Sequence, residues 1–305
     1  MQKKIALFWI LLNCLGLLFS VSIVVFPEKK ESGYYLYCFV ESEETTILST
    51  NIFVTGHDLF LMLDSFIEGN KVVSGAFIPE KDIIDNVKYG LTVYIQTLDG
   101  RKSYREELLG MNGVLLPLQP PEIPYHEEHI ANHQVLPGEY LYKLAVEYGV
   151  DRADLELLNK DKVNGVHTGD ELIIGSVSFE DGPYEILISL KYCRLTLFYE
   201  EREIISFPVA VGSGQRTPEG IYYIKRKVED PALYWEGEYI QPLSPINGLG
   251  KWWLELSNPQ YGIHGTNKPW EIGKRISHGC IRMFNEDVSL LQSLVPVGTR
   301  VIIKE

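Results

Sequence analysis

The chain has 305 residues, of which 45% are apolar and 23% are charged, and its formal net charge is −13. This length predicts two or three domains, because a domain typically holds about 100–150 residues. The apolar fraction excludes a wholly disordered chain, and the acidic balance excludes a nucleic-acid-binding protein, which needs a basic surface. The four cysteines form no C-x-x-C pair, which argues against a zinc finger and a disulfide scaffold.

Residues 1–30 begin with two lysines, after which the chain is apolar from Ile5 to Phe26. As a helix this run would span about 33 Å, enough to cross the hydrocarbon core of a membrane. No A-x-A cleavage pattern follows it, so an uncleaved anchor is preferred over a cleaved signal peptide. We therefore expect one transmembrane helix.

Residues 31–118 predict a small α+β domain to which the sequence assigns no chemistry. Apolar or alternating runs predict strands at Tyr34–Val40, Ile47–Val54, Val72–Ile78 and Leu91–Thr97. Helical spacing of apolar residues predicts helices over Asp58–Ile67 and Glu80–Val87.

Residues 119–132 are rich in proline and read as an extended linker. Three histidines and two glutamates lie between His126 and His133, but they lack the H-E-x-x-H spacing of a zinc site. We expect no metal and no other cofactor.

Residues 133–175 predict a β-α-α-β unit. Leu141, Leu144, Ala145 and Tyr148 follow the spacing of one helix face, which ends near Gly149. A second short helix after Asp151 and a strand at 171–174 complete the unit. The stretch VLPGEYLYKLA, followed by LELLN and TGDELII, resembles a LysM domain.

That resemblance implies binding to N-acetylglucosamine-containing glycan strands of peptidoglycan. The residues then near the sugar are Gly138, Glu139, Tyr140, Leu141 and Asn159. The alternative is a structural spacer that keeps the same core.

Residues 182–305 predict a mainly-β domain with one helix at Asn285–Leu294, for which Asn285 is the expected N-terminal cap. The predicted strands are Tyr184–Ser189, Cys193–Tyr199, Ile204–Val211, Ile221–Val228, Trp252–Leu256, Tyr261–His264, Cys280–Met283 and Arg300–Ile303.

One stretch of this domain, residues 263–283, carries the candidate chemistry. Cys280 follows Ser277-His278-Gly279, and His264 lies between two glycines in the same stretch. A thiolate is a nucleophile and an imidazole can generate it, so these residues predict a cysteine nucleophile with a histidine base. The alternative is an inert buried cysteine beside ordinary loop histidines.

The order H-G-T then S-H-G-C-I-R-M, with R-T-P-E-G upstream at residues 216–220, closely resembles the L,D-transpeptidase catalytic (YkuD) domain. The resemblance implies that the Gly265 carbonyl holds one nitrogen of the His264 ring. It further implies that His278 and Gly279 shape an oxyanion site with the Cys280 amide. Ser277 would organise local hydrogen bonds.

Substrate contacts are expected at Arg282, Tyr261 and Trp270, with Arg282 pairing with a substrate carboxylate. The resemblance implies attack of Cys280 on a peptidoglycan stem peptide, release of D-alanine and transfer of the acyl group to an amine, giving a 3→3 crosslink. It also implies acylation of the same sulfur by carbapenems.

Such an enzyme would face the cell wall, with its C-terminal domains outside the membrane, or would be secreted and wall-associated. Two other functions stay open: a hydrolytic cysteine peptidase with water as acceptor, and a wall-binding protein without catalysis.

Overall fold

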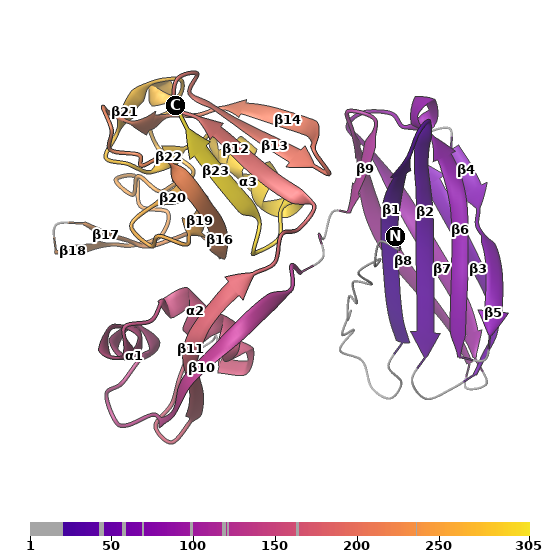
Figure 1. Cartoon of the computed structure of the whole chain (residues 1–305), viewed down its shortest axis with the longest axis horizontal. Helices are drawn as coiled ribbons and strands as arrows, with labels where there is room; N and C mark the ends of the chain where they lie inside the picture. The colour runs from indigo at the N-terminus through magenta and orange to yellow at the C-terminus, as the bar shows by residue number, and fades with distance from the viewer. Residues whose placement is uncertain are drawn as a thin grey trace, which may run out of the picture. The chain divides into compact units, whose positions relative to one another are not determined.

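The structure, a computed structural model, describes residues 21–42, 46–56, 59–68, 70–97, 100–117, 120, 122–162, 165–235 and 237–305. The chain divides into two units, Met1–Pro121 and Glu122–Glu305 (Figure 1). Most of the apolar N-terminal run, residues 1–20, lies outside the described ranges.

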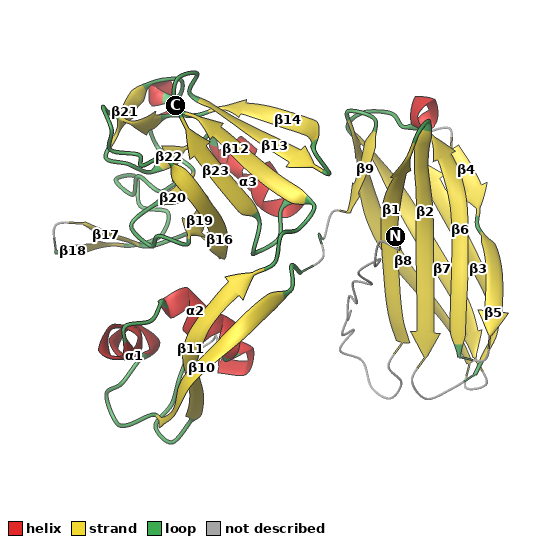
Figure 2. Ribbon diagram, in the orientation of Figure 1, coloured by secondary structure: helices red, strands yellow, loops and turns green. Residues whose placement is uncertain are grey.

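The described part of the first unit is built almost wholly of strands (Figure 2). One antiparallel sheet has the order β1-β2-β6-β5, and the other has the order β4-β3-β7-β8-β9. The bounds are β1 Val21–Lys30, β2 Gly33–Ser42, β3 Ile47–Gly56, β4 Leu59–Met62, β5 Asp64–Glu68, β6 Lys71–Pro79, β7 Val87–Thr97, β8 Gly100–Met111 and β9 Val114–Pro117. A 3₁₀ turn, η1, spans Glu80–Asp82.

The two sheets pack face to face, with β3 against β5 and β6. Every second residue of β7 from Tyr89 to Ile95 is buried, and the same holds for β2 from Tyr34 to Cys38. Period-two burial of this kind places one face of each sheet in a shared core. Each of the four predicted strands is found here, as part of β2, β3, β6 or β7.

The predicted helices of this unit are wrong. Asp58–Ile67 contributes the strands β4 and β5, and Glu80–Val87 contributes only the turn η1. Backbone pairing of β4 with β3 and of β5 with β6 overrides the apolar spacing, which in short segments does not distinguish helix from strand.

The apolar run that predicts a transmembrane helix also differs in its described part. Val21–Phe26 belongs to β1 and pairs with β2, so that Val25 lies opposite Cys38. Within the described residues, no helix is both long and apolar enough to cross a membrane.

The second unit begins with the predicted β-α-α-β order. Its elements are β10 Tyr125–Gln134, α1 Leu141–Tyr148, α2 Arg152–Leu158, the 3₁₀ turn η2 Lys160–Lys162 and β11 Glu171–Phe179. Helix α1 ends at Gly149 in the left-handed conformation, as predicted. The core consists of Val135, Leu141, Leu144, Ala145, Leu155, Leu172 and Ile174. We call residues 125–179 the βααβ unit.

The predicted linker is a strand over most of its length. From Tyr125 onward it belongs to β10, which pairs with β11 so that Tyr125 lies opposite Phe179. Most of β10 is exposed, and apart from Tyr125 its only apolar residues are the adjacent Ile130 and Ala131. The strand therefore shows no apolar alternation from which it could be recognised.

The rest of the second unit is organised on an eight-stranded mixed sheet of order β14-β13-β12-β23-β16-β19-β20-β22. Its strands are β12 Tyr184–Ser189, β13 Arg194–Tyr199, β14 Arg202–Pro208, β16 Gly220–Glu229, β19 Trp252–Leu256, β20 Gly262–His264, β22 Ile281–Arg282 and β23 Arg300–Lys304. Two short pairs flank it, β15 Val211–Gly212 with β21 Arg275–Ser277, and β17 Leu233–Trp235 with β18 Glu238–Ile240. A 3₁₀ turn, η3 Pro269–Glu271, and the helix α3 Asn285–Leu294 complete the domain.

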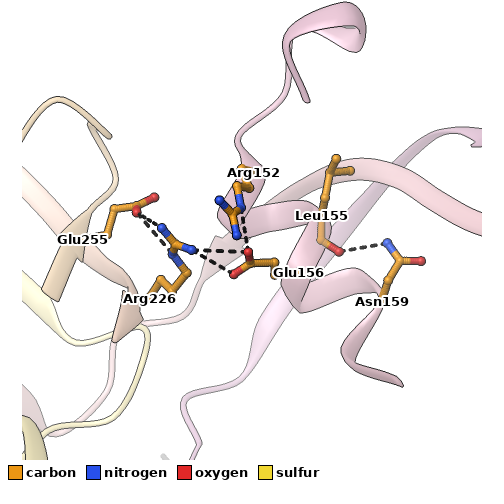
Figure 3. Close-up of polar contacts among 6 residues, drawn as sticks. All are labelled: Arg152, Leu155, Glu156, Asn159, Arg226 and Glu255. Atoms are coloured by element: carbon orange, nitrogen blue, oxygen red, sulfur yellow. Dashed lines mark hydrogen bonds and ion pairs between the residues drawn. The ribbon is translucent and has the colours of Figure 1, made fainter. Parts of the chain in front are cut away.

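The βααβ unit is docked on this sheet through helix α2 and strand β16. Lys225 Nζ lies 2.6 Å from Asp154 Oδ1, and both side chains are less than a tenth exposed. Beside this pair, Arg226 contacts Glu156 of α2 and Glu255 of β19 (Figure 3). Because Lys225 and Asp154 are buried between the two parts, the βααβ unit packs directly against the sheet.

Candidate active site

Two short parallel strands bring the predicted nucleophile and base together. β20 pairs with β22 so that Ile263 lies opposite Ile281 and His264 lies opposite Arg282. Side chains alternate along a strand, so Cys280, one residue before Ile281, faces the same side as His264. The two residues, sixteen positions apart in sequence, therefore form one site.

His264 is held in one orientation. Its ring is stacked on Trp253, with centroids 5.6 Å apart, and its Nδ1 lies 2.6 Å from the carbonyl oxygen of Gly265. A carbonyl only accepts, so Nδ1 carries the hydrogen and Nε2 keeps its lone pair. The predicted contact between His264 and Gly265 is confirmed, and it makes Nε2 the basic atom.

Burial sets the charge of this ring. His264 is 4% exposed. Desolvation lowers its pKa from 6.5 to about 4, against smaller upward effects of the Gly265 and Leu249 carbonyls. The imidazole is therefore neutral near pH 7 and free to accept a proton.

Cys280 is a free, partly exposed thiol whose Sγ lies 3.8 Å from the carbonyl oxygen of Gln260. Burial raises its pKa, and this outweighs the opposing effects of the Gly262 amide and of Arg282. The thiol thus stays protonated at neutral pH and depends on a base for its nucleophilicity. Cys193 is buried and its pKa is likewise raised by burial, in keeping with its predicted place in the core.

The turn before the sulfur is fixed by Ser277. Its Oγ donates to the Cys280 carbonyl at 2.6 Å and accepts from the Gly279 amide at 3.1 Å, so Ser277 organises the turn as predicted. Gly279 has φ +143°, and a Cβ there would lie 2.6 Å from a ring carbon of Tyr261.

This arrangement leaves one backbone amide as a donor for the predicted oxyanion site. The Gly279 amide already donates to Ser277, whereas no described residue accepts a hydrogen bond from the Cys280 amide. The backbone N–H of Cys280 is accordingly the donor available for a developing oxyanion. The side chain of His278 is exposed next to it.

Arg282 pairs with a carboxylate of the chain itself. Its Nη1 donates to Glu271 of η3, and its buried Nε has no hydrogen-bond partner within the described chain. The predicted contact of Arg282 with a substrate carboxylate stays a prediction. Tyr261 is half-buried beside Gly279, whereas Trp270 in η3 is 66% exposed.

Three of the five predicted glycan-binding residues point inward. Leu141 belongs to the core of the βααβ unit, and the buried amide of Asn159 bonds the backbone of Leu155 and Ile173 (Figure 3 shows the Leu155 bond). Glu139 accepts from the Leu136 amide and from His133. Of these five residues, Gly138 and Tyr140 are exposed.

One residue beside the candidate site was misjudged from the sequence. Asn285 is the predicted cap of α3, but the N-cap position is occupied by Phe284 and Asn285 is the first helical residue. Its Oδ1 instead accepts from the amides of Lys251 and Thr266, and its Nδ2 donates to the Thr266 carbonyl. An asparagine at a helix start is the ordinary signal of a cap, so only the tertiary structure reveals this second use.

Known proteins match the part of the chain that carries this site. The family model of the L,D-transpeptidase catalytic domain, YkuD, matches residues 183–303. The "Putative L,D-transpeptidase YkuD" of Bacillus licheniformis is 40% identical over 174 residues, which cover 56% of this chain and 97% of that protein. The protein of the same name in Bacillus subtilis is 37% identical over 173 residues, covering 56% and 97%.

A solved structure, that of the catalytic domain of an E. faecium L,D-transpeptidase, is similar over 40% of this chain and 96% of its own, with 22% identity and a TM-score of 0.34. The relatives in Bacillus, matched over nearly their whole length, establish the family: the chain belongs to the YkuD-type L,D-transpeptidases.

Proposed function

We propose that this protein crosslinks peptidoglycan stem peptides through an acyl-enzyme on Cys280, with His264 as the general base. The observation that carries the proposal is the contact of His264 Nδ1 with the Gly265 carbonyl, because it leaves Nε2 unprotonated on the face that Cys280 shares. A base with a fixed tautomer can generate the thiolate at the moment of attack.

In the acylation step, Nε2 of His264 takes the thiol proton while the Cys280 sulfur attacks the carbonyl carbon of the third stem residue. The π electrons of the carbonyl move to its oxygen, which the Cys280 amide binds. The C–N bond then breaks, the imidazolium returns its proton to the departing nitrogen, and D-alanine leaves. A thioester on Cys280 remains.

In the second step, a side-chain amine of another stem peptide attacks the thioester and gives up a proton to His264. The C–S bond breaks, the sulfur leaves as a thiolate, and the imidazolium returns its proton to that sulfur. A 3→3 amide crosslink is the product. One amide is exchanged for another, so the reaction needs no external energy source.

We further propose that the enzyme acts outside the cytoplasmic membrane, where this substrate lies, and that the βααβ unit contacts its glycan strands as a LysM-like module. The exposed Tyr140, beside Gly138 in the turn after β10, supports the second proposal. Tyr140→Ala should weaken sedimentation with insoluble peptidoglycan without changing turnover of soluble muropeptides. Unchanged sedimentation would remove the glycan-binding role.

The proposal is tested by incubating the protein with purified disaccharide-tetrapeptides and measuring the masses of the products by mass spectrometry. The expected product is a dimer equal in mass to two substrates minus one D-alanine. Tripeptide monomers alone would instead show that water is the acceptor and that the enzyme is a carboxypeptidase. Unchanged tetrapeptide would contradict both.

A further inference from the structure

A buried threonine links the R-T-P-E-G motif to the nucleophile. Thr217 is 2% exposed and lies 62 positions before Gly279 in sequence. Its Oγ1 accepts from the Gly212 amide at 2.8 Å and lies 2.7 Å from the Gly279 carbonyl oxygen. Because an amide N–H only donates and a carbonyl only accepts, the hydroxyl hydrogen is committed to Gly279.

The hydroxyl has little freedom to point elsewhere. Gly212 is anchored on β21, where it pairs with Ser277, and a Cβ at Gly212 would lie 2.6 Å from Thr217 Oγ1. Pro218 follows directly and restricts the backbone of Thr217 to extended conformations. The threonine is therefore held from both sides at a fixed distance from the turn that bears the cysteine.

The carbonyl that Thr217 holds belongs to the peptide unit whose other end is the Cys280 amide. In a trans peptide the C=O and N–H point in opposite directions, and the unit is rigid. Fixing the Gly279 oxygen toward the protein interior thus aims the Cys280 N–H the other way. This is the amide that no described residue engages.

We propose that Thr217 is a positioning residue for the oxyanion hole: its hydroxyl sets the direction of the Cys280 amide through the Gly279 carbonyl. Ser277 fixes the next peptide by donating to the Cys280 carbonyl. Two hydroxyls, from Thr217 and Ser277, thereby clamp the peptides on either side of the nucleophile. The inference rests on the proposed acyl transfer at Cys280.

Two reactions of the same sulfur separate this role from a merely structural one. Acylation by a carbapenem passes through a tetrahedral oxyanion, whereas alkylation by iodoacetamide displaces iodide and forms none. In Thr217→Val, acylation should slow by roughly ten- to a hundredfold, because a misaligned donor loses much of its effect. Alkylation should stay at the wild-type rate, because the thiol and its base are untouched.

Thr217→Ser, which keeps the hydroxyl, should restore acylation. Thr299→Val is the matched control: Thr299 is also fully buried and donates to a carbonyl, that of Pro296, but it lies outside the cysteine turn. It should leave the ratio of acylation to alkylation unchanged. If Thr217→Val does not fold, Thr217→Ala removes the same hydroxyl without placing a methyl group against the two polar atoms.

The outcomes are distinct. A lowered ratio in Thr217→Val, with a wild-type ratio in Thr217→Ser and Thr299→Val, supports the inference. An unchanged ratio in Thr217→Val, or equal slowing of both reactions, overturns it. No carbapenem adduct on Cys280 in the wild-type protein would instead remove the proposed function.

Discussion

The side-chain amide of Asn285 bridges two backbone segments beside the base, with its Oδ1 3.0 Å from the Lys251 amide and 3.3 Å from that of Thr266. Two glycines make room for it, since a Cβ at Gly250 or Gly265 would lie within about 2.2 Å of the same oxygen. The carbonyl that orients His264 thus belongs to a segment held by Asn285.

Asn285→Ala should impair acylation of Cys280 while leaving the sulfur in place. It removes the three hydrogen bonds that hold Lys251 and Thr266, so the Gly265 carbonyl is free to shift. Displacements of about 1 Å at a catalytic group cost up to roughly a hundredfold in rate. Stopped-flow acylation by a carbapenem measures this loss. Asn285→Asp keeps the acceptor oxygen, so its acylation rate should lie between those of the wild type and Asn285→Ala. A wild-type rate in Asn285→Ala would show that Asn285 does not hold the base in place.

Acylation should persist to unusually low pH. Burial lowers the pKa of His264 to about 4, so the ring becomes protonated only as the pH falls through about 4. A protonated ring can no longer act as the base. The rate of acylation under second-order conditions, measured from pH 3.5 to 8, should therefore show its acid limb near 4. An acid limb near 6.5 would show that the ring is not buried as neutral imidazole.

The same ring should make folding stability depend on pH. Its folded pKa of about 4 lies below its ordinary value of 6.5, so the unfolded chain takes up the proton first as pH falls. The free energy of unfolding should therefore be highest above about pH 6.5 and should fall by roughly 3 kcal/mol as the pH drops from 6.5 to 4. Urea unfolding at pH 7 and pH 4 measures it.

His264→Gln removes this titration, so its stability should fall less than that of the wild type between the two pH values. His126→Gln is the control, since the His126 side chain is 77% exposed. Equal pH dependence in the wild type and His264→Gln would contradict the assignment.

The docking of the βααβ unit predicts a large effect of one buried charge. Asp154→Ala leaves Lys225 buried with a single remaining acceptor, the Val177 carbonyl, and should destabilise the second unit by roughly 3–5 kcal/mol. Four of the five tryptophans follow Pro121, so tryptophan fluorescence in urea reports mainly on this unit. Glu122→Ala breaks the exposed pair with Lys160 and should cost less than about 1 kcal/mol. Similar losses in the two variants would mean that the docking pair is not buried in solution.

The catalytic domain could be predicted closely because its strands alternate apolar and polar residues between glycine and proline breaks. Tyr184–Ser189, Trp252–Leu256 and the helix Asn285–Leu294 have the predicted bounds. The cysteine and histidine could be predicted because rare residue types recur at a characteristic spacing.

Other features depend on tertiary partners that leave no local signal. The exposed strand β10 lacks apolar alternation, and the apolar spacing of Asp58–Ile67 fits a helix as well as the strands β4 and β5. Glu271 and Arg282 are eleven positions apart, and nothing in the sequence marks them as a pair. The same holds for Thr217 and Gly279, which only the folded chain brings together.

The covalent chemistry of Cys280 is tested most directly by incubating the full chain with a carbapenem. Intact-mass spectrometry then detects the adduct, and peptide mapping locates it. The account predicts one adduct, on Cys280, formed roughly 10²–10⁴-fold more slowly when His264 is replaced by alanine. Cys280→Ala should form none. An adduct on Cys193 or Cys38, or an undiminished adduct in Cys280→Ala, would contradict the account.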